Sequence, residues 1–315
     1  MESARCKAFL AAAELGSLSK AAEKLNYTAS GVSQLISALE NEFGFPLLRR
    51  TSKGVFLTLE GEQMLPAVRA FLQQENRIYE LAANINGLDI GEITIAAYSS
   101  IATHWLPKVI ADFKKKYPNI HINLREGVRQ EVLQYMDEGK ADIGLLSGGD
   151  DIKYDRIPLA EDPMIAVLPK DHTFANADKF PLSQCVNERF IMPALGKDED
   201  VVKMLSRYSI TPEIVYSTNE SFSAWAMVEN GLGMSITNEL LMHGWKCDVA
   251  KVPIYPPEKI TLGIIIPSLK HASPAVKRFV NLAEGELKKI KQNVPGILEQ
   301  NEILKLINQE SKNDD

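Results

Sequence analysis

Small or polar side chains recur at helical spacing between residues 28 and 43. They follow the i, i+3, i+4, i+7 pattern that puts residues on one face of a helix, and they are Ser30, Ser33, Gln34 and Ser37. The opposite face is apolar, with Val32, Leu35, Ile36, Leu39 and Phe43. Hydroxyl and amide groups on a helix can contact phosphates and base edges in the DNA major groove. A solvated face without a partner has the same pattern, so the flanking elements must decide between the two interpretations.

Three cations follow this helix. Gly54 separates two short β-compatible runs, residues 48–50 and 55–58, which predicts a small hairpin or wing. Arg49, Arg50 and Lys53 lie in it, and we expect them to contact phosphates or the minor groove. The alternatives are a solvated turn and, for Arg50, a bond to a carboxylate that holds the wing.

A pair of serines, Ser99 and Ser100, lies where a predicted strand meets a predicted helix. Backbone N–H groups and the positive end of a helix gather around an anion at such a junction. The alternative is that a serine only caps the helix.

Other residues that could do chemistry are scattered. The five histidines are interpreted as structural or surface groups, and they are His104, His121, His172, His243 and His271. The cysteines Cys6, Cys185 and Cys247 have no C-x-x-C spacing, which predicts neither a disulfide framework nor a zinc site. No nucleophile elbow, H-E-x-x-H or Walker loop occurs. We therefore expect no enzymatic activity, no cofactor and no metal.

Three short helices must position the polar face. They are predicted at residues 4–14, 19–25 and 28–43, with Gly16 and Gly44 ending the first and third, and Ser17 or Ser19 capping the second. Three helices with tight connections form a helix-turn-helix unit. Together with the wing, this unit favours DNA binding as the role of the polar face.

A long helix is predicted next, over residues 58–86, with Pro66 near its start. Its residues at alternating steps of four and three are apolar except Glu75, and they are Met64, Val68, Phe71, Ile78, Ala82 and Ile85. This heptad spacing predicts a dimerisation helix. Residues 87–91 then mark a linker.

After the linker, strands alternate with helices. Strands are predicted at residues 93–97, 120–124, 142–146, 164–168, 190–193, 213–216 and 260–266, with helices at 128–139, 200–208, 221–229 and 274–290 among them. This alternation is typical of a mainly parallel α/β sheet, and the length fits two lobes with a cleft between them. Ser273 is expected to cap the last helix, with Pro274 in its first position.

Composition limits the location and the partners. The 315 residues are 45% hydrophobic, enough for at least two domains, yet no run of about 18 apolar residues occurs. Because Glu2, Arg5 and Lys7 interrupt the amino terminus, no signal peptide is predicted and a cytoplasmic protein is expected. The formal net charge is −6, but residues 1–60 hold seven basic groups against six acidic ones. Contact with DNA would therefore be local and multivalent.

Many of these residues occur in a fixed order. Residues 16–25 are GSLSKAAEKL, followed by Val32-Ser33, Leu39-Glu40, Gly44, residues 47–50, Leu57-Thr58 and Gly61-Glu62. In this order they resemble the amino-terminal signature of LysR-type transcriptional regulators. Looser similarity follows at residues 106–107, 113, 117–118, 141–145, 169–172 and 228–234, so that the resemblance covers about residues 9–287.

The resemblance implies an all-α winged helix-turn-helix DNA-binding domain and a two-lobed α/β effector domain with the type 2 periplasmic-binding-protein-like fold. It implies that the chain crosses between the lobes near residues 161–164 and returns near 259–262, and that a homotetramer binds two adjacent DNA sites. The predicted domains are the winged helix-turn-helix at 1–60, the dimerisation helix at 58–87, lobe 1 at 88–163 and 261–292, lobe 2 at 164–260, and an extension at 293–315. The extension is expected to form a helix that packs on lobe 1 or on a neighbouring subunit.

The resemblance also implies a small-molecule effector at Ser99 and Ser100. The further polar lining that it implies is Ser147, Thr218 and Asn219, with His104, Arg129 and Met192 as secondary candidates. Neutral donors at a helix start can solvate negative charge, so we expect an organic acid or another anion.

The chain departs from the family on the predicted recognition helix. Ala29, Leu35 and Ser37 stand where many members have Gln, Gln and Lys or Arg. Fewer direct base contacts are expected, and the operator preference of other members does not transfer.

Two other functions stay open. A stand-alone solute-binding receptor would share the two-lobed fold but would leave residues 1–86 without a role. A redox-sensing regulator would use Cys185 and Cys247, as in peroxide-sensing relatives, although an isolated cysteine usually behaves as a small buried hydrophobe.

Overall fold

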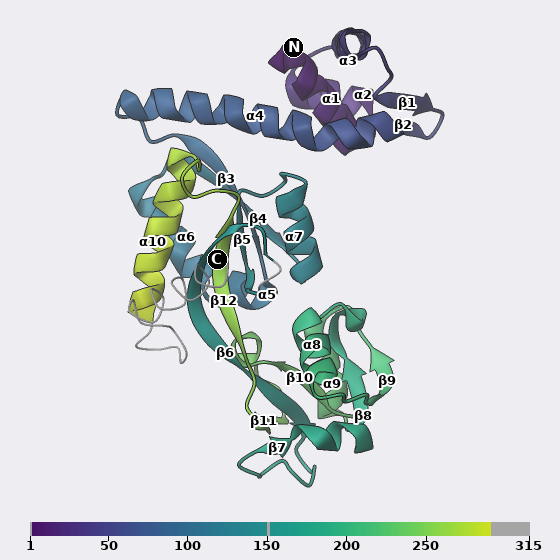
Figure 1. The fold of residues 1–315 in the computed structure, drawn as a ribbon, viewed down its shortest axis with the longest axis vertical. Coiled ribbons are helices and arrows are strands. Elements are labelled where there is room, and N and C mark those ends of the chain that lie inside the picture. Colours follow the sequence, from purple (N-terminus) through teal and green to yellow (C-terminus); the bar gives the residue numbers. More distant parts are fainter. Residues whose placement is uncertain (1, 150–151, 291–315) are drawn as a thin grey trace, which may run out of the picture. The chain divides into compact units, whose positions relative to one another are not determined.

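A computed structural model describes residues 2–149 and 152–290 of the chain (Figure 1). Contacts divide the chain into two compact units. The first comprises Met1–Gly91 together with Asp137–Lys140, and the second comprises Glu92–Met136 and the chain from Ala141 onward.

The first unit begins with the three predicted helices, α1 (Ser3–Leu15), α2 (Leu18–Leu25) and α3 (Ala29–Phe43). Gly16 and Gly44 take left-handed conformations at the ends of α1 and α3, which favours glycine there. The Ser17 hydroxyl caps α2 by accepting a hydrogen bond from the Lys20 N–H at 3.4 Å. The helices share one core, with Phe9, Val32, Ile36, Leu39 and Leu47 among its buried residues.

The wing is a hairpin of β1 (Leu48–Thr51) and β2 (Gly54–Leu57), in which Thr51 pairs with Gly54. The Val55 N–H bonds the Gly16 carbonyl at 2.9 Å, which ties the wing to the turn between α1 and α2. A Cβ at Gly54 would lie 2.7 Å from the Gly16 oxygen, and φ there is +129°. Only glycine therefore fits at this corner.

The long helix α4 (Leu59–Ile85) does not expose the predicted heptad seam along its whole length. In its first half, Met64, Val68 and Phe71 pack against the core of their own unit. In its second half, Ile78 is 65% exposed and Ile85 is 84% exposed. The apolar repeat therefore serves two purposes, because the globular core takes its first half and only the second half stays exposed.

The second unit is built on an eight-stranded sheet in the order β4-β3-β5-β12-β6-β11-β7, with β10 also paired to β6. Its strands are β3 (Gly91–Ala97), β4 (Ile120–Glu126), β5 (Ile143–Ser147), β6 (Asp155–Pro169), β7 (Phe180–Pro181), β10 (Ser235–Asn238), β11 (Val249–Tyr255) and β12 (Lys259–Ile266). Two further strands, β8 (Arg189–Met192) and β9 (Glu213–Ser217), form a separate pair.

The expectation of a mainly parallel sheet was wrong. β3 runs parallel to β5, but β12 is antiparallel to both β5 and β6, and β10 and β11 are antiparallel to β6. Sequence analysis missed β10 and β11, and it predicted only the last part of β6. Long apolar strands that are buried on both faces do not alternate in polarity, so their sequence does not reveal their direction.

The long strand β6 joins two lobes. Its first part pairs with β12 as far as Pro163, and its last part pairs with β10 and β11. In Figure 1, α10 (Pro274–Ile290), α6 (Leu106–Lys116) and α7 (Arg129–Asp137) lie beside one end of the sheet, while α8 (Glu199–Arg207) and α9 (Ser221–Glu229) lie at the other. The main hydrophobic clusters follow the same division, with Ile95 and Phe113 in one and Phe180 and Met204 in another.

Short helices complete the second unit. They are α5 (Ser99–His104) and the 3-10 helices η1 (Leu182–Asn187), η2 (Pro193–Gly196) and η3 (Glu239–Met242). Ser273 caps α10 as predicted, since its hydroxyl accepts from the Val276 N–H at 3.3 Å. The predicted carboxy-terminal extension, residues 293–315, lies outside the described residues.

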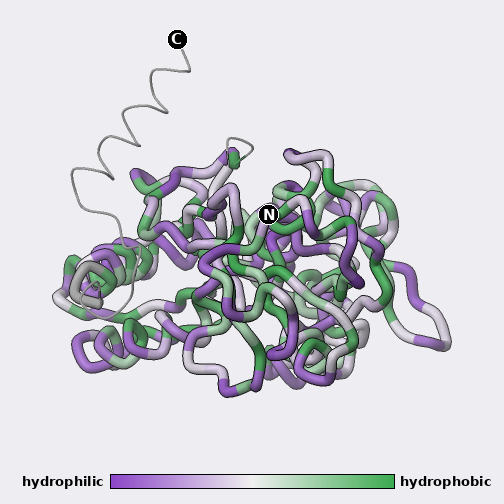
Figure 2. Tube along the Cα trace, turned by 90° about the horizontal axis from the view of Figure 1, so that it is seen from below, coloured by the Kyte–Doolittle hydropathy of each residue, from purple (hydrophilic) through white to green (hydrophobic). Residues whose placement is uncertain are grey.

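Hydrophobic and hydrophilic residues are interspersed along the chain, as Figure 2 shows. Within residues 2–149 and 152–290, no helix combines the length and the apolar character that crossing a membrane requires.

Candidate functional sites

The predicted recognition face lies on α3. Ser30 and Gln34 are exposed, and Ser33 and Ser37 are partly exposed, while Val32, Ile36 and Leu39 are buried on the other side. The Thr28 hydroxyl caps α3 by accepting from the Gly31 N–H at 3.1 Å. The helix start therefore presents short polar groups over a rigid core, a shape that suits close approach to another surface.

The wing is fixed to α3 by two side chains. Glu40 accepts hydrogen bonds from the backbone N–H groups of Leu47 and Leu48 at 2.7 and 3.0 Å. The Arg50 guanidinium donates to the Ser33 hydroxyl at 2.9 Å. Arg50 thus holds the wing against the recognition helix through a hydroxyl, where a carboxylate was one of the expected alternatives.

Cations differ in their pairing across the first unit. Arg5, Lys7 and Lys24 pair with Glu42, Glu75 and Glu14, respectively. Among the described residues, four exposed cations of this unit have no ion pair: Lys20, Arg49, Arg50 and Lys53. The Arg49 guanidinium lies 5.6 Å from the centre of the Phe56 ring. Lys20 was not among the predicted contacts, although its position at the start of the second helix of the motif was visible in the sequence.

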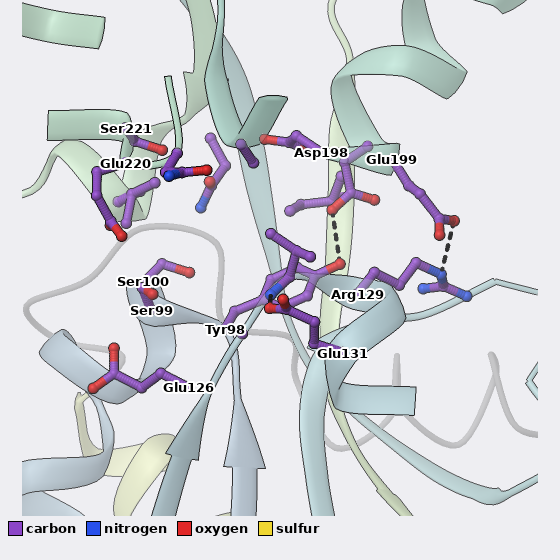
Figure 3. Close-up of a pocket in the computed structure, with 18 of the residues that line it drawn as sticks. Tyr98, Ser99, Ser100, Glu126, Arg129, Glu131, Asp198, Glu199, Glu220 and Ser221 are labelled. Carbon is purple, nitrogen blue, oxygen red and sulfur yellow. Dashed lines mark hydrogen bonds and ion pairs between the residues drawn. The ribbon is translucent and has the colours of Figure 1, made fainter. Parts of the chain in front are cut away.

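A cavity of about 300 Å³ opens between the lobes of the second unit (Figure 3). It is lined by residues that follow β3 and β4 in one lobe, and by residues near the starts of α8 and α9 in the other. Figure 3 shows Ser99, Ser100 and Glu126 of one lobe opposite Glu220 and Ser221 of the other. The volume is at the lower end of the range for small-molecule pockets.

The predicted serine pair lines this cavity. The residue that caps α5 is Tyr98, and neither serine side chain makes a capping bond. Ser100 is only 2% exposed, and its hydroxyl has no hydrogen-bond partner among the described residues. A hydroxyl that lines the cavity without a protein partner is available to hydrogen-bond a ligand there.

The other predicted effector contacts are divided. Asn219 lines the cavity, but Ser147 and Thr218 do not. The Thr218 hydroxyl donates to the Glu220 carbonyl at 2.9 Å, and the Ser147 hydroxyl bonds Asp200 at 2.8 Å. These two hydroxyls are therefore engaged within the protein.

The secondary candidates for effector contact also differ in position. Arg129 lines the cavity, whereas His104 and Met192 do not. The His104 ring packs edge-on against His243, with centroids 5.6 Å apart, and burial lowers the pKa of His104, with the charge of His243 adding to the effect. Met192 is buried in the core of the second lobe.

Carboxylates, which sequence analysis did not single out, dominate the lining. Six of them line the cavity: Glu126, Glu131, Asp198, Glu199, Asp200 and Glu220. They come from three stretches of the chain, residues 126–131, 198–200 and 220, so no single local motif could have identified the whole set. Arg129 is the only basic residue among the lining residues.

Two of these carboxyl groups have altered acidity. Burial, reinforced by the charge of Asp200, raises the pKa of Asp198 to about 6. Burial also raises the pKa of Asp200, against the lowering effect of hydrogen bonds from Ser147 and Tyr98. Both shifts disfavour the ionised form, because burial removes water from around the carboxylate.

Hydrogen bonds join the two lobes beside the cavity. The Tyr98 hydroxyl donates to Asp200 Oδ2 at 3.2 Å, and the Ser147 hydroxyl bonds the other oxygen of the same carboxylate. Arg129 Nε lies 3.5 Å from Glu199 Oε2. We call this set of contacts, from Tyr98, Arg129 and Ser147 to Glu199 and Asp200, the inter-lobe network.

The cysteines lie in unreactive surroundings. Burial raises the pKa of Cys185 to about 12, with the charge of Glu188 as a smaller cause. Cys185 belongs to one hydrophobic cluster of the second lobe and Cys247 packs against another. No group of His, Cys, Asp or Glu suited to a metal ion occurs in the described part of the chain.

Comparisons with known proteins identify both units. Residues 4–62 match the family model of the bacterial regulatory helix-turn-helix protein, lysR family. Residues 86–288 match the model of the LysR substrate binding domain.

Named relatives match along most of their length. The chain is 33% identical to the HTH-type transcriptional regulator YvbU of Bacillus subtilis over 285 residues, covering 88% of this chain and 96% of the relative. It is 28% identical to the HTH-type transcriptional regulator YnfL of Escherichia coli, covering 86% and 94%.

Solved structures share the fold. Full-length OxyR from Pseudomonas aeruginosa has a TM-score of 0.76 at 19% identity, covering 95% of this chain and 99% of that one. Full-length CbnR in complex with its target DNA has a TM-score of 0.64 at 20% identity, covering 90% and 99%.

Proposed function

The chain belongs to the LysR family of transcriptional regulators, and from this membership we propose that it binds operator DNA sequence-specifically under the control of a small molecule bound between its lobes. The contact surface on DNA is the polar face of α3, with Ser30, Ser33, Gln34 and Ser37, and the wing cations Arg49, Arg50 and Lys53. Lys20 adds a further cation. Such a protein acts in the cytoplasm, where its DNA is.

The observation that carries this proposal is the bond between Arg50 and Ser33. It couples a basic wing to a helix face of short polar groups, so both elements can contact one stretch of duplex. Small hydroxyls on the helix allow close approach to base edges, and the wing cations neutralise phosphates.

Among the described residues of the first unit, only four exposed cations are without an ion pair, so one DNA-binding unit would bind weakly. Association of several subunits would supply the remaining affinity. We propose a homodimer through the exposed half of α4 and a homotetramer that binds two adjacent sites. CbnR, which shares the fold, has been solved with its target DNA, and this supports a DNA-bound form of the fold.

The proposed effector site is the cavity lined by Ser99, Ser100 and Asn219. We place Ser147 and Thr218 behind it, where they position Asp200 and Glu220. Lobe 1 is assigned to residues 88–163 and 261–292 and lobe 2 to residues 164–260. A ligand that contacts both lobes changes the equilibrium between more open and more closed forms, because it binds one form more tightly.

The test is selection of genomic fragments by the full-length protein, followed by footprinting at controlled salt. We expect a small set of protected sites with two adjacent half-sites. Removing the cations in the Arg49→Ala and Lys53→Ala variants should weaken binding at every sequence and reduce its salt dependence. Retention of no fragment above the level of a DNA-free control would overturn the proposal and would favour a stand-alone receptor.

The redox alternative has less support. A thiol with a pKa near 12 holds almost no thiolate at neutral pH, and the thiolate is the form that reacts with peroxide. OxyR is similar at 19% identity, which concerns the fold alone.

A further inference from the structure

We propose that the cavity between the lobes binds an organic cation, such as a primary amine or a guanidine, and not the organic acid that its hydroxyl groups predicted from the sequence. This inference rests on the proposed function, since it names the chemical class of the effector at that site.

Charge around the cavity is the first argument. Six carboxylates and one guanidinium line it. Arg129 is 3% exposed and is occupied by Glu199 and by the carbonyl and hydroxyl oxygens of Ser147. An anionic ligand would meet the repulsion of the carboxylates without an accessible cation to offset it.

Pairing of the carboxylates is the second argument. Glu199 is paired with Arg129 and Lys203. The carboxylates of Glu126 and Glu220 have no hydrogen bond or ion pair with any described residue. They come from opposite lobes, and in Figure 3 they flank Ser99 and Ser100. Both line the same cavity, so a bound ammonium or guanidinium group would find acceptors on either lobe.

The neutral lining is compatible with this assignment. The Ser100 hydroxyl, which lines the cavity and has no described partner, can accept a hydrogen bond from an ammonium as well as donate one to an acid. It therefore marks a ligand site without selecting the sign of the ligand. The ring of Phe222 also lines the cavity, and an aromatic face attracts cations.

A bare metal ion fits the cavity less well. The described residues contain no cluster of ligands with metal-binding geometry, and the six carboxylates are distributed around about 300 Å³. A space of this size takes a small organic molecule, with its charged group near Glu126 and Glu220 and its apolar part near Met164, Phe222 and Ile260.

The test is thermal shift and calorimetry on the full-length chain with matched probes. The amines are putrescine, agmatine and phenethylamine, and the acids are adipate and hydrocinnamate, which have skeletons similar to those of putrescine and phenethylamine. We expect at least one amine to raise Tm at concentrations at which the acids have no effect. Glu126→Gln and Glu220→Gln should each weaken amine binding about tenfold, because each removes a charged hydrogen-bond acceptor.

Glu213→Gln is the matched control, since Glu213 is exposed on β9 and does not line the cavity. It should bind the amine as the parent does. The cation assignment is overturned if only the acids raise Tm, or if no amine raises it. It is also overturned if amines raise Tm but both cavity variants bind them as the parent does. DNA binding without ligand is measured in parallel, and its loss would instead count against the proposed function.

Discussion

Ser33 lies at the junction of the recognition helix and the wing, and its replacement tests the DNA-binding face. Ser33→Glu adds a negative charge that repels phosphate and pairs with Arg50, and so removes that cation from the DNA as well. We expect DNA binding to be abolished in gel-shift assays, with an unchanged circular dichroism spectrum and oligomeric state. Ser206→Glu adds the same charge at an exposed position of α8, and this variant should bind DNA as the parent does. Parental affinity of Ser33→Glu would mean that the face points away from DNA.

Ser100 and Thr218 both have hydroxyls near the cavity, but their surroundings differ. Ser100→Ala removes a cavity hydroxyl without a described partner and should raise the half-maximal effector concentration about tenfold. Thr218→Ala removes a bond to the Glu220 carbonyl, so its effect should be less than about threefold. Titration of ligand-dependent DNA binding distinguishes them, and a larger effect from Thr218 would place the ligand deeper in the second lobe.

Asp198 links stability to pH. Its pKa is about 6 in the folded chain against 3.8 as the ordinary value, so the folded state binds the proton more tightly. Its contribution to stability is therefore fully present below about pH 4 and is lost as pH rises through about 6. Asp198→Asn removes this loss and keeps a residue that caps α8 well.

We expect Asp198→Asn to be more stable than the parent at pH 7.5 by about 1 to 2 kcal/mol, and equally stable near pH 4. Thermal unfolding at the two pH values measures this difference. Asp178→Asn, at an exposed position, should change stability little at either pH. A variant that is less stable than the parent at pH 7.5 would contradict the burial argument.

At the scale of the element, we expect aspartate substitutions in the two halves of α4 to have different effects. Ile78→Asp changes an exposed residue, so the fold should survive while the dimer dissociates, because a charge would be buried without a partner in the subunit interface. Phe71→Asp changes a residue that packs on the core of the first unit, so it should lower Tm before it alters association.

Analytical ultracentrifugation and thermal unfolding separate the two effects. Lys20→Ala, a substitution outside α4, should retain the parental oligomer. If Ile78→Asp sediments as the parent does, the subunits associate through another surface.

At the scale of the whole second unit, the inter-lobe network sets how firmly the lobes are closed. Tyr98→Phe removes one hydroxyl from this network and keeps the ring. We expect faster hydrogen exchange of the strand ends around the cavity and an altered half-maximal ligand concentration, since the closed form loses a bond that the open form does not make.

Tyr208→Phe is a matched control, because its hydroxyl bonds Glu258 at 2.7 Å within the second lobe. It removes a bond of the same type without affecting lobe closure. Equal exchange behaviour of the two variants would mean that the network does not govern closure.

The sequence by itself determined the elements whose signals are local. Gly16 and Gly44 end helices because they adopt left-handed backbone, and Ser17 and Ser273 cap helices through their own neighbours. The order of motifs identified the family, and Ser99 and Ser100 were found because a strand-to-helix junction is visible along the chain.

Only the tertiary structure decided what depends on residues distant in sequence. The antiparallel direction of β12 follows from packing, and so does the split of α4 into a half that joins the core and a half that stays exposed. An apolar pattern in the sequence does not show which partner covers each residue. The engagement of Ser147 depends on Asp200, which lies in the other lobe. The acidic character of the cavity arises because the fold brings carboxylates from three stretches of the chain together, and interactions between charges depend on their distance in space and not along the chain.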